Sequence, residues 1–343
     1  MTEHGASGGA GIWSAGGRAF VQFGDALFER TPSALTLLAA GFSARVVLAE
    51  HWGKVYATDG RKHVEIDGSA ARNWGLPVPA VTLTPVAGSL RPGRYLACAA
   101  FVDAAGNEGG CSDLVAVAGT GFSVAVTGAS QSVVAVNLYA SRADQPQPSF
   151  VVAFPLALLP FGLVDPSLLG AGDPPKTAQM IGPILAAEGI ASHRAFLLMW
   201  RGNAVFRSEA AEPHLFHPDN ILQFPSPVTA VEGTAGGLWV GTERGLWWVV
   251  GGDSGDWVPV LKTHEPVARG SHRIQGAKLP GLDLGEQRLA LFVSESGLIA
   301  ATEDGGIVPI TAGRYRFDPA RRYRFAYTEH GDLRQLLILG GDW

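Results

Sequence analysis

The chain has 343 residues, of which 47% are hydrophobic and only 17% are charged. This balance requires that much apolar surface is buried, either in a core or against partner proteins. The formal net charge of -5 argues against a function in which the whole chain binds nucleic acid. Glycine (45 residues) and proline (22 residues) are frequent, which is typical of many short strands joined by tight turns.

The first part of the chain predicts strands rather than a targeting segment. Its start, MTEHGASGGAGIW, has neither a basic stretch nor an apolar core, so no signal peptide is expected. A short apolar run, a glycine-containing turn and a second short run then follow in GRAFVQFGDALFER, with the turn at Gly24-Asp25. The pattern recurs in GKVYATDGRKHVEID, with the turn at Asp59-Gly60. It predicts β-hairpins, because tight hairpin turns need residues that tolerate a positive φ.

The same hairpin pattern occurs four more times in the second half of the chain. The predicted turns lie at Gly202-Asn203, near Arg244-Gly245, near Ser296-Gly297 and at Gly331-Asp332. Six hairpins at irregular spacings predict the blades of a β-propeller.

Residues 78–158 interrupt this series and have a character of their own. Short strands alternate there with turns, in RYLACAAFVDAAGNEGGCSDLVAV, GFSVAVTG, SVVAVNLYASRA and SFVVAFP. The length and the number of strands predict a small β-sandwich inserted into a loop of the propeller, since exposed loops tolerate insertions. Pro77 and Pro79 mark its entry, and Pro155 and Pro160 mark its exit.

Cys98 and Cys111 both lie in this inserted segment and match no zinc or redox pattern. The favoured interpretation is two reduced, half-buried thiols. A cross-strand disulfide stays geometrically conceivable, because a turn lies between the two residues.

The fold class predicted is all-β. Only residues 174–190 could hold a turn or two of helix, and Gly182-Pro183 interrupts them. The longest apolar stretches, such as SFVVAFPLALLPFGLV, carry prolines and are too short to span a bilayer, so no membrane insertion is predicted. We expect a five- or six-bladed β-propeller formed by residues 12–77 and 159–343, with a β-sandwich inserted at 78–158.

The segment RGNAVFRSEAAEPHLFHPDN, residues 201–220, gathers side chains that could bind a metal. These are Glu209, Glu212, His214, His217 and Asp219. An H-x-x-H pair coordinates zinc only where the backbone turns both imidazoles inward. The prolines at 213 and 218 forbid a continuous helix, so the segment predicts a structured inter-blade loop and no metal site.

Tryptophans crowd one predicted hairpin and its surroundings, at Trp239, Trp247, Trp248 and Trp257. Trp247 and Trp248 are adjacent, so on a strand they point to opposite faces. We expect one of them to pack between blades and the other to meet solvent or a partner. Core packing is favoured over a sugar-binding platform.

The segment RYRFDPARRYRF, residues 314–325, interleaves arginines with aromatic residues. Its arginines are Arg314, Arg316, Arg321, Arg322 and Arg324. The alternation predicts two strands hinged at Asp318-Pro319, with arginines outward and aromatic rings inward. Outward arginines leave two alternatives open, a contact between subunits and a contact with DNA.

Signatures of catalysis do not appear in the sequence. There is no H-E-x-x-H, Walker or dinucleotide-binding motif. TEDGG (302–306) faintly resembles the aspartate turn of sialidase-type propellers, but the accompanying serine and tryptophan are missing. A glycosidase needs two facing carboxylates, and the mutual placement of candidates such as Glu209 and Asp304 stays open. No catalytic, cofactor-binding or metal-binding residue is predicted.

An ordered set of stretches resembles tailed-bacteriophage virion proteins built on a β-propeller. RYLACAAFVDAAGNEGGCSD and VVAVNLYASRA are similar to strands of a fibronectin-type domain, and GIWSAGGRAFVQFGDALFERT is similar to a first blade. ASHRAFLLMWRGNAVFRSEAAEPHLFHPDNILQF, PVTAVEGTAGGLWVGTERGLWWVVGGD and GLIAATEDGGIVPIT follow in order. The set resembles podovirus tail nozzle and packaged-DNA stabilisation proteins and related tail-tip proteins, over roughly residues 12–310.

The resemblance implies a fibronectin type III/Ig-like inserted domain and a structural role in the virion tail, at the tail tip/baseplate or the nozzle. It implies a homo-oligomer that contacts other tail proteins, assembles in the host cytoplasm, and has no catalysis and no cofactor. DNA contact is possible but is not predicted. Two alternatives remain. A tail-tip module that binds a host receptor or glycan predicts an exposed aromatic patch. A carbohydrate-active propeller enzyme or lectin predicts a deep polar pocket with carboxylates and soluble monomers.

Overall fold

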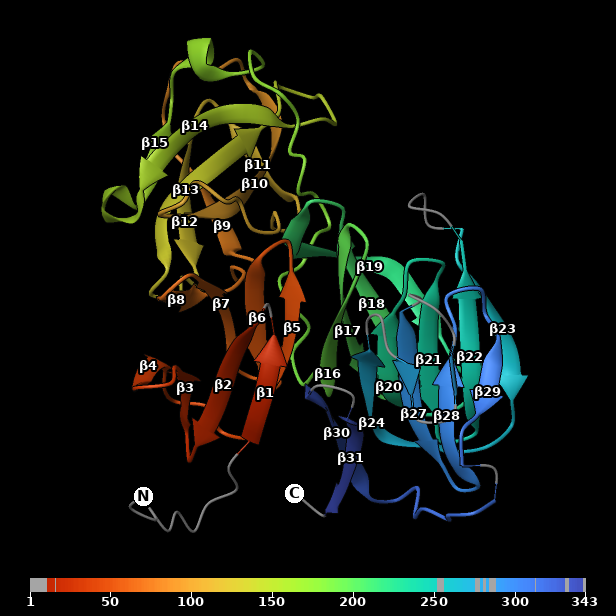
Figure 1. Cartoon of the computed structure of the whole chain (residues 1–343). Coiled ribbons are helices and arrows are strands. Elements are labelled where there is room, and N and C mark those ends of the chain that lie inside the picture. The colour runs from red at the N-terminus through yellow and green to blue at the C-terminus, as the bar shows by residue number, and fades with distance from the viewer. Residues whose placement is uncertain are drawn as a thin grey trace. The chain divides into compact units, whose positions relative to one another are not determined.

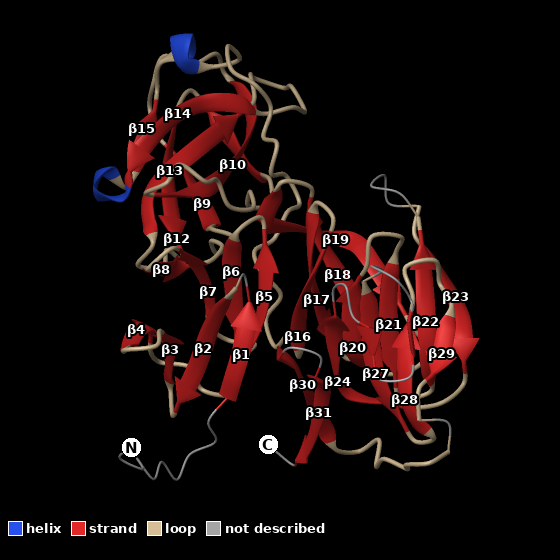
Figure 2. Cartoon of the chain, viewed as in Figure 1, coloured by secondary structure: helices blue, strands red, loops and turns tan. Residues whose placement is uncertain are grey.

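The computed structural model describes residues 11–15, 17–251, 256–274, 278–279, 282–283, 288–311, 313–330 and 333–341. These residues form an all-β structure of short strands and turns (Figures 1 and 2). They contain no α-helix, and residues 174–190, the one stretch that could hold a turn or two of helix, form none. The two short 3-10 turns lie elsewhere, at η1 (Leu156–Leu158) and η2 (Pro166–Leu168). Among the described residues, no helix is long and apolar enough to cross a membrane.

The chain divides into two compact units. Unit 1 comprises Met1–Arg72, Ile184–Ala211 and Asn220–Trp343, and unit 2 comprises Asn73–Pro183 and Glu212–Asp219. Unit 2 therefore interrupts unit 1 in the sequence, and it extends beyond the predicted inserted domain, 78–158. Its start is earlier because Leu76 is already buried in its core. Its end is later because the strand β15 (Phe161–Leu163) follows both exit prolines and still pairs with β12 (Phe122–Thr127).

Unit 1 contains four antiparallel sheets of four strands that follow one another in sequence order, and a six-stranded sheet. Four strands of the six-stranded sheet form a similar antiparallel meander, here called sheet V. Sheet I contains β1 (Gly11–Ala15), β2 (Arg18–Phe23), β3 (Ala26–Arg30) and β4 (Leu35–Ala39). Sheet II contains β5 (Val47–His51), β6 (Lys54–Thr58), β7 (His63–Asp67) and β8 (Ala70–Asn73), whose last residue groups with unit 2. Sheet III contains β16 (Gly189–His193), β17 (Phe196–Arg201), β18 (Ala204–Glu209) and β19 (Glu212–Gln223).

Sheets IV and V continue the series. Sheet IV contains β20 (Val228–Gly233), β21 (Leu238–Thr242), β22 (Gly245–Val250) and β23 (Val258–Thr263). Sheet V contains β24 (Val267–Ile274), β27 (Leu289–Ser294), β28 (Gly297–Ala301) and β29 (Ile307–Pro309). In the sequence, β25 (Lys278–Leu279) and β26 (Leu282–Asp283) lie between β24 and β27 and form a separate two-stranded sheet. A C-terminal hairpin follows, formed by β30 (Arg322–His330) and β31 (Leu333–Gly341), and β30 pairs with β24 in parallel at Arg269 and Arg322.

The predicted hairpin turns lie between consecutive strands of these sheets. Gly24 and Gly202 have φ values of 58° and 57°, and Gly60 has a φ of 87°, in the left-handed region that glycine adopts without a steric cost. The turns predicted near Gly245 and Gly297 lie one residue earlier, because each glycine is already the first residue of a strand. The turn residues Gly331 and Asp332 lie outside the described residues, although β30 and β31 pair along their whole length.

The first strands of successive sheets lie side by side. β1 contacts β5, β5 contacts β16, β16 contacts β20, β20 contacts β24, and β24 contacts β30. Four-stranded meanders whose first strands follow one another in this way have the character of a β-propeller. The buried side chains form cores between neighbouring sheets: between I and II, between III and IV, between IV and V, and between V and the C-terminal hairpin.

Unit 2 contains two sheets that share one core. A four-stranded sheet has the order β11 (Val115–Gly119), β10 (Gly93–Asp103), β13 (Val133–Ala140) and β14 (Ser149–Pro155). A three-stranded sheet has the order β15, β12 and β9 (Ala80–Pro85). Fully buried rings from both sheets meet in the core, among them Phe101, Phe122 and Tyr95, whose ring lies 5.7 Å from that of Phe122.

Candidate interaction surface

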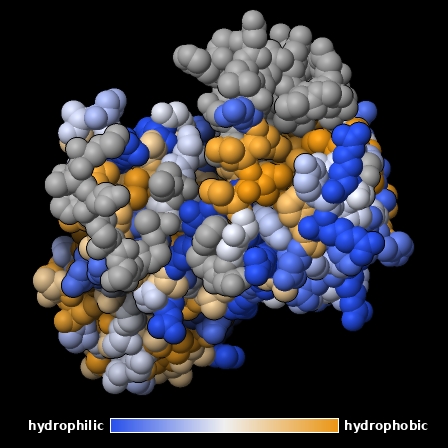
Figure 3. Space-filling model, turned by 60° about the horizontal axis from the view of Figure 1, so that its bottom comes forward, coloured by the Kyte–Doolittle hydropathy of each residue, from blue (hydrophilic) through white to orange (hydrophobic). Residues whose placement is uncertain are grey.

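The last strands of three parts of unit 1 expose large apolar side chains. These strands are β4, β23 and β31. The exposed residues are Leu35 (51%), Leu37 (57%), Val258 (56%), Val260 (41%), Leu337 (51%) and Leu339 (57%). Figure 3 shows hydrophobic residues gathered into patches on the face it presents, rather than spread evenly.

The alternation along β31 explains how both of its faces come to be apolar. Leu336 and Ile338 pack against the core between sheet V and the hairpin, so Leu337 and Leu339 point to the opposite face. Proteins usually protect the outer strand of a sheet with lysine, proline or a covering element, because its free backbone groups can pair with another chain. β23 carries Pro259 and Lys262, whereas β4 and β31 carry neither residue type. We call β4 and β31 the open edge strands.

The C-terminal hairpin makes the edge at β31 larger than the edge of an ordinary sheet. β30 continues the series of first strands that β1, β5, β16, β20 and β24 begin. Sheets I to V each place three further strands outside the first, but the hairpin places only β31 there. Within the described part of the chain, no strand pairs with the outer side of β31, although the short strand β25 contacts β31.

The ligand-like segment 201–220 forms two strands and not an inter-blade loop. Gly202-Asn203 is the turn between β17 and β18, as predicted, but Glu212–Gln223 is the strand β19, so the loop prediction is wrong. The two prolines exclude a helix, yet they are compatible with an outermost strand, where one side of the backbone needs no partner. Asn220, at the boundary between the two units, donates from its amide to Glu209 over 2.9 Å.

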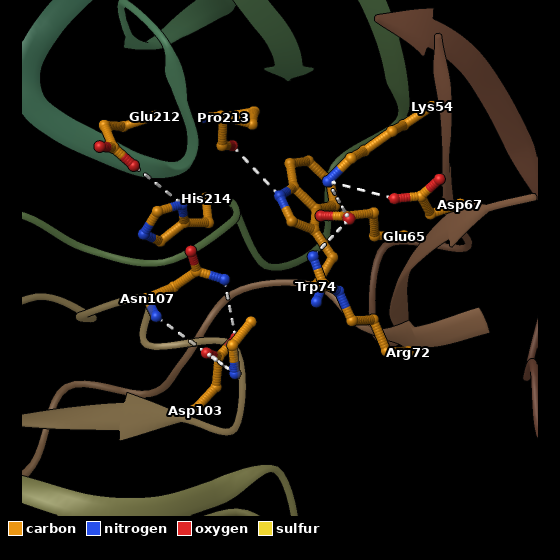
Figure 4. A network of polar contacts seen from close by, with 11 residues as sticks. Lys54, Glu65, Asp67, Arg72, Trp74, Asp103, Asn107, Glu212, Pro213 and His214 are labelled. Atoms are coloured by element: carbon orange, nitrogen blue, oxygen red, sulfur yellow. Dashed lines mark hydrogen bonds and ion pairs between the residues drawn. The ribbon is translucent and has the colours of Figure 1, made fainter. Parts of the chain in front are cut away.

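The two histidines of β19 are not arranged as a chelating pair. They are three residues apart on a strand and therefore point to opposite faces. His214 Nε2 lies 3.1 Å from the backbone oxygen of Glu108. Its Nδ1 lies 3.5 Å from the Glu212 carboxylate (Figure 4). His217 Nδ1 accepts a hydrogen bond from the Asp219 N–H at 3.2 Å. No group of three or more His, Cys, Asp and Glu side chains that could hold a metal occurs among the described residues.

The polar contacts of β19 within unit 2 hold the strand in place. The Trp74 indole donates to the Pro213 carbonyl over 3.2 Å (Figure 4). Its ring lies 6.3 Å from that of Phe216. Phe216 also pairs through its backbone with Ile181. In unit 1, Figure 4 shows the ion pairs of sheet II, where Glu65 is 2.8 Å from Lys54 and 2.7 Å from Arg72. Ion pairs near the surface contribute little to stability.

Glu108 is the centre of a polar network that the sequence did not single out. Its carboxylate accepts hydrogen bonds from the hydroxyls of Tyr139 (2.6 Å) and Thr177 (2.7 Å) and from the amide of Asn137. Burial, together with the bond to Glu108, raises the pKa of Tyr139. The donors come from β13 and from the turn at 176–179, which are distant in sequence. The carboxylate is satisfied by these bonds, so the network stabilises unit 2 rather than presenting a reactive acid.

Cys98 and Cys111 are free thiols in the structure and are buried more deeply than predicted. They are 1% and 4% exposed, and they pack in a small core with Tyr139 and Phe150. The hydrogen bond between the two thiols, followed by burial, raises the pKa of Cys111. The Cys111 thiol is therefore protonated near neutral pH and is a poor nucleophile.

The tryptophans of sheet IV pack into cores. Trp239 and Trp248 lie with their ring centroids 4.7 Å apart, in the core between sheets IV and V. Trp247 points to the opposite face, where its ring lies 5.8 Å from that of Phe224. It is only partly buried, but it packs against the core between sheets III and IV.

The arginine-rich segment 314–325 forms one strand instead of the predicted two. Arg322 opens β30, while the residues from Arg314 to Asp318 form no strand because a turn begins them: the Arg314 N–H bonds to the Thr311 oxygen at 2.8 Å. Within β30 the alternation holds for Arg322, which is exposed, and Tyr323, which is 8% exposed. Arg324 is half-buried and stacks over a tryptophan ring, so its predicted outward position is wrong.

The carboxylates considered for glycoside cleavage each serve a local turn or strand. Glu209 accepts the hydrogen bond from Asn220. Asp304 accepts bonds from the Thr302 hydroxyl and the Gly306 N–H, and these bonds lower its pKa. These hydrogen bonds give both carboxylates a structural role in their strand or turn.

Comparisons with known proteins find only distant similarity in structure. No protein-family profile and no curated protein matches the sequence. A structure of BBS1N in complex with ARL6DN is 8% identical, with a TM-score of 0.39, and the match covers 97% of this chain and 89% of that one. Apo AztD from Citrobacter koseri is 10% identical, with a TM-score of 0.33, and the match covers 88% of this chain and 71% of that one. PorZ, a surface component of the type-IX secretion system of Porphyromonas gingivalis, is 10% identical, with a TM-score of 0.25, and the match covers 96% of this chain and 43% of that one. Similarity at this level identifies no family and no function.

Proposed function

We propose that this protein is a structural component of a bacteriophage tail, at the tail tip/baseplate or the nozzle, where it forms a rigid oligomeric scaffold. In this proposal unit 1 is a β-propeller of five complete blades and a two-stranded sixth, and unit 2 is an inserted fibronectin type III/Ig-like sandwich. The observation that carries the proposal is the pair of open edge strands. The ordered resemblance to tailed-bacteriophage virion proteins is the reason for proposing a phage tail as the assembly.

Open edges support assembly for two physical reasons. A free strand edge can pair with a strand of another chain through main-chain hydrogen bonds. Exposed leucines beside that edge, such as Leu337 and Leu339, add apolar area that a neighbouring subunit covers. A chain that works alone usually avoids this combination, because it promotes association.

Placing lysines at the edge of β31 tests whether this surface mediates assembly. We expect the wild-type chain to sediment as an oligomer in analytical ultracentrifugation. The double variant L337K/L339K should sediment as a monomer, because assembly would have to desolvate two charges. V250K is the matched control. Val250 is also exposed (39%), but it lies on β22, which has a partner strand on each side, so the control should assemble like the wild type.

The location in the particle needs a separate test. Cryo-electron microscopy of purified tailed particles should place the chain at symmetry-related positions of the tail. Its absence from the particles, or a wild-type chain that sediments as a monomer at all concentrations, contradicts the proposal.

One observation favours a second candidate, a tail-tip module that binds a host receptor or glycan. Trp52 is 57% exposed, and its ring stacks on that of His51 with the centroids 4.5 Å apart. A fixed and exposed indole can stack on the face of a sugar ring. This candidate is favoured over the scaffold if the wild type is a monomer that binds a glycan and the W52A variant no longer binds it.

A further inference from the structure

Three segments of unit 1 that are distant in sequence meet at one tryptophan ring. Trp13 lies on β1, Arg45 lies two residues before β5, and Arg324 lies on β30 (Figure 1). The guanidinium carbon of Arg45 is 5.8 Å from the centroid of the Trp13 ring, and that of Arg324 is 5.3 Å from it. Arg322, two residues before Arg324, adds a third positive charge that acts on both.

Arg45 has too few partners for a charged group in its position. Its Nε is fully buried and makes no hydrogen bond in the structure. Within the described part of the chain, no carboxylate forms an ion pair with Arg45, and its contact is the cation-π contact with Trp13. Burial, then the charges of Arg324 and Arg322, lower the pKa of Arg45 to about 10, so the group still carries its charge at neutral pH. An unpaired charge at a partly buried site favours the binding of an anion.

A carboxylate close to this cluster is already engaged. Glu188 forms an ion pair with Arg269 and accepts a hydrogen bond from the Gly202 N–H at 2.8 Å. Burial opposes the ionisation of Glu188, but these bonds outweigh it and lower its pKa. Glu188 therefore neutralises Arg269 first, and the charge of Arg45 is left for another anion.

We propose that Arg45, Arg322 and Arg324 form a binding site for a phosphate group beside the ring of Trp13. Guanidinium groups suit this ligand, because their planar N–H pairs form hydrogen bonds with phosphate oxygens. The guanidinium group also keeps its positive charge at all physiological pH values. A phosphate dianion brings two negative charges to the site and compensates the charge of Arg45, which has no ion-pair partner among the described residues. The cation-π contacts with Trp13 hold Arg45 and Arg324 in place before the ligand arrives. The phosphate group comes either as free inorganic phosphate or from a polynucleotide, each of whose phosphodiesters carries one negative charge.

Calorimetric titration tests the site with two probes at matched ionic strength. The first probe is inorganic phosphate, and the second is a 12-nucleotide single-stranded DNA. We expect one phosphate group bound per chain, and at least a tenfold loss of affinity in R45Q. R244Q is the matched control, since Arg244 is an exposed arginine in the turn between β21 and β22, and it should bind like the wild type. Tight binding of phosphate alone identifies a free ion as the source, and much tighter, salt-dependent binding of the oligonucleotide identifies a polynucleotide.

Thermal unfolding separates this proposal from a purely structural role of the stack. In phosphate-free buffer R45Q should unfold at the same temperature as the wild type or above it, because it removes an uncompensated charge. Phosphate should raise the Tm of the wild type by several degrees and leave that of R45Q unchanged. The proposal is overturned if phosphate stabilises R45Q as much as the wild type, or if neither probe binds the wild type.

Discussion

At the scale of single residues, burial sets the charge state of two histidines in unit 1. His51 is 2% exposed, and its Nδ1 lies 2.9 Å from the Ser192 hydroxyl. His63 lies 2.8 Å from the Thr58 hydroxyl. Burial lowers the pKa of each ring to about 4. In His63 the negative charge of Asp59 acts in the opposite direction and raises the pKa, but burial outweighs it. Both rings are therefore neutral at pH 7, and protonating either one requires a charge to enter a buried site.

Because of these two histidines, the protein should lose stability in mild acid. Their pKa values in the folded chain, about 4, lie below the ordinary value of 6.5, so the unfolded chain binds more protons between these pH values. The free energy of unfolding consequently falls as the pH falls from about 6.5 to about 4. We expect the Tm, measured by scanning calorimetry, to fall across this window, with a shallower fall in H51Q.

H264Q is the control for the pH series, because His264 is exposed and lies in the same unit. It should keep the slope of the wild type. A Tm that stays constant between pH 6.5 and 4 would contradict the burial argument.

At the scale of the elements, similar turns are under different constraints. The hairpin turns at Gly24 and Gly60 both use a positive φ. A Cβ at Gly24 would meet nothing within 4 Å, whereas a Cβ at Gly60 would lie 2.8 Å from the Ala187 backbone oxygen. The Gly60 oxygen also accepts a hydrogen bond from the Ala186 N–H at 2.6 Å. The sequence predicts both turns, but only the long-range packing distinguishes them.

Alanine substitution should measure this difference. G24A should cost about 1–2 kcal/mol of unfolding free energy, which is the steric cost of a side chain at positive φ. G60A should cost at least about 1 kcal/mol more, because the added methyl group must displace backbone. Urea unfolding of both variants checks the difference, and equal losses would show that the segment at Ala186 and Ala187 moves away freely.

The interaction surface was only partly predictable from the local pattern. Alternation and glycine turns correctly predicted the central hairpins, because these depend on residues close in sequence. β4 was not predicted, although its LTLLA run without lysine or proline was a usable signal. β19 was predicted as a loop, since two prolines and several polar residues are typical of loops. Pairing at the outside of sheet III overrides that local preference.

At the scale of the whole molecule, each unit has its own core. Phe101 is fully buried between the two sheets of unit 2, and Phe292 is fully buried between sheets IV and V of unit 1. Separate cores allow one unit to lose stability while the other keeps it. The cores thus predict two cooperative units, although the chain enters and leaves unit 2 more than once.

Hydrogen exchange on two matched variants tests the independence of the units. F101A and F292A should each cost about 3–5 kcal/mol, as expected for a fully buried phenylalanine. F101A should lower the protection of backbone amides in unit 2 and leave sheets IV and V protected, and F292A should do the reverse. A loss of protection that spreads over both units in either variant would show a single cooperative unit.

By itself, the sequence determined an all-β chain, the positions of the central hairpins and a distinct segment after residue 77. These features follow from alternating apolar residues and from turns that need a positive φ, which act over a few neighbouring residues. Only the tertiary structure decided which strands lie at the edge of a sheet with one side unpaired. It also decided that His214 and His217 lie on one strand, β19, and face opposite ways. It brought Arg45 and Arg324 to the same ring, that of Trp13. Such contacts join residues that are far apart in sequence, so no local pattern of side chains specifies them.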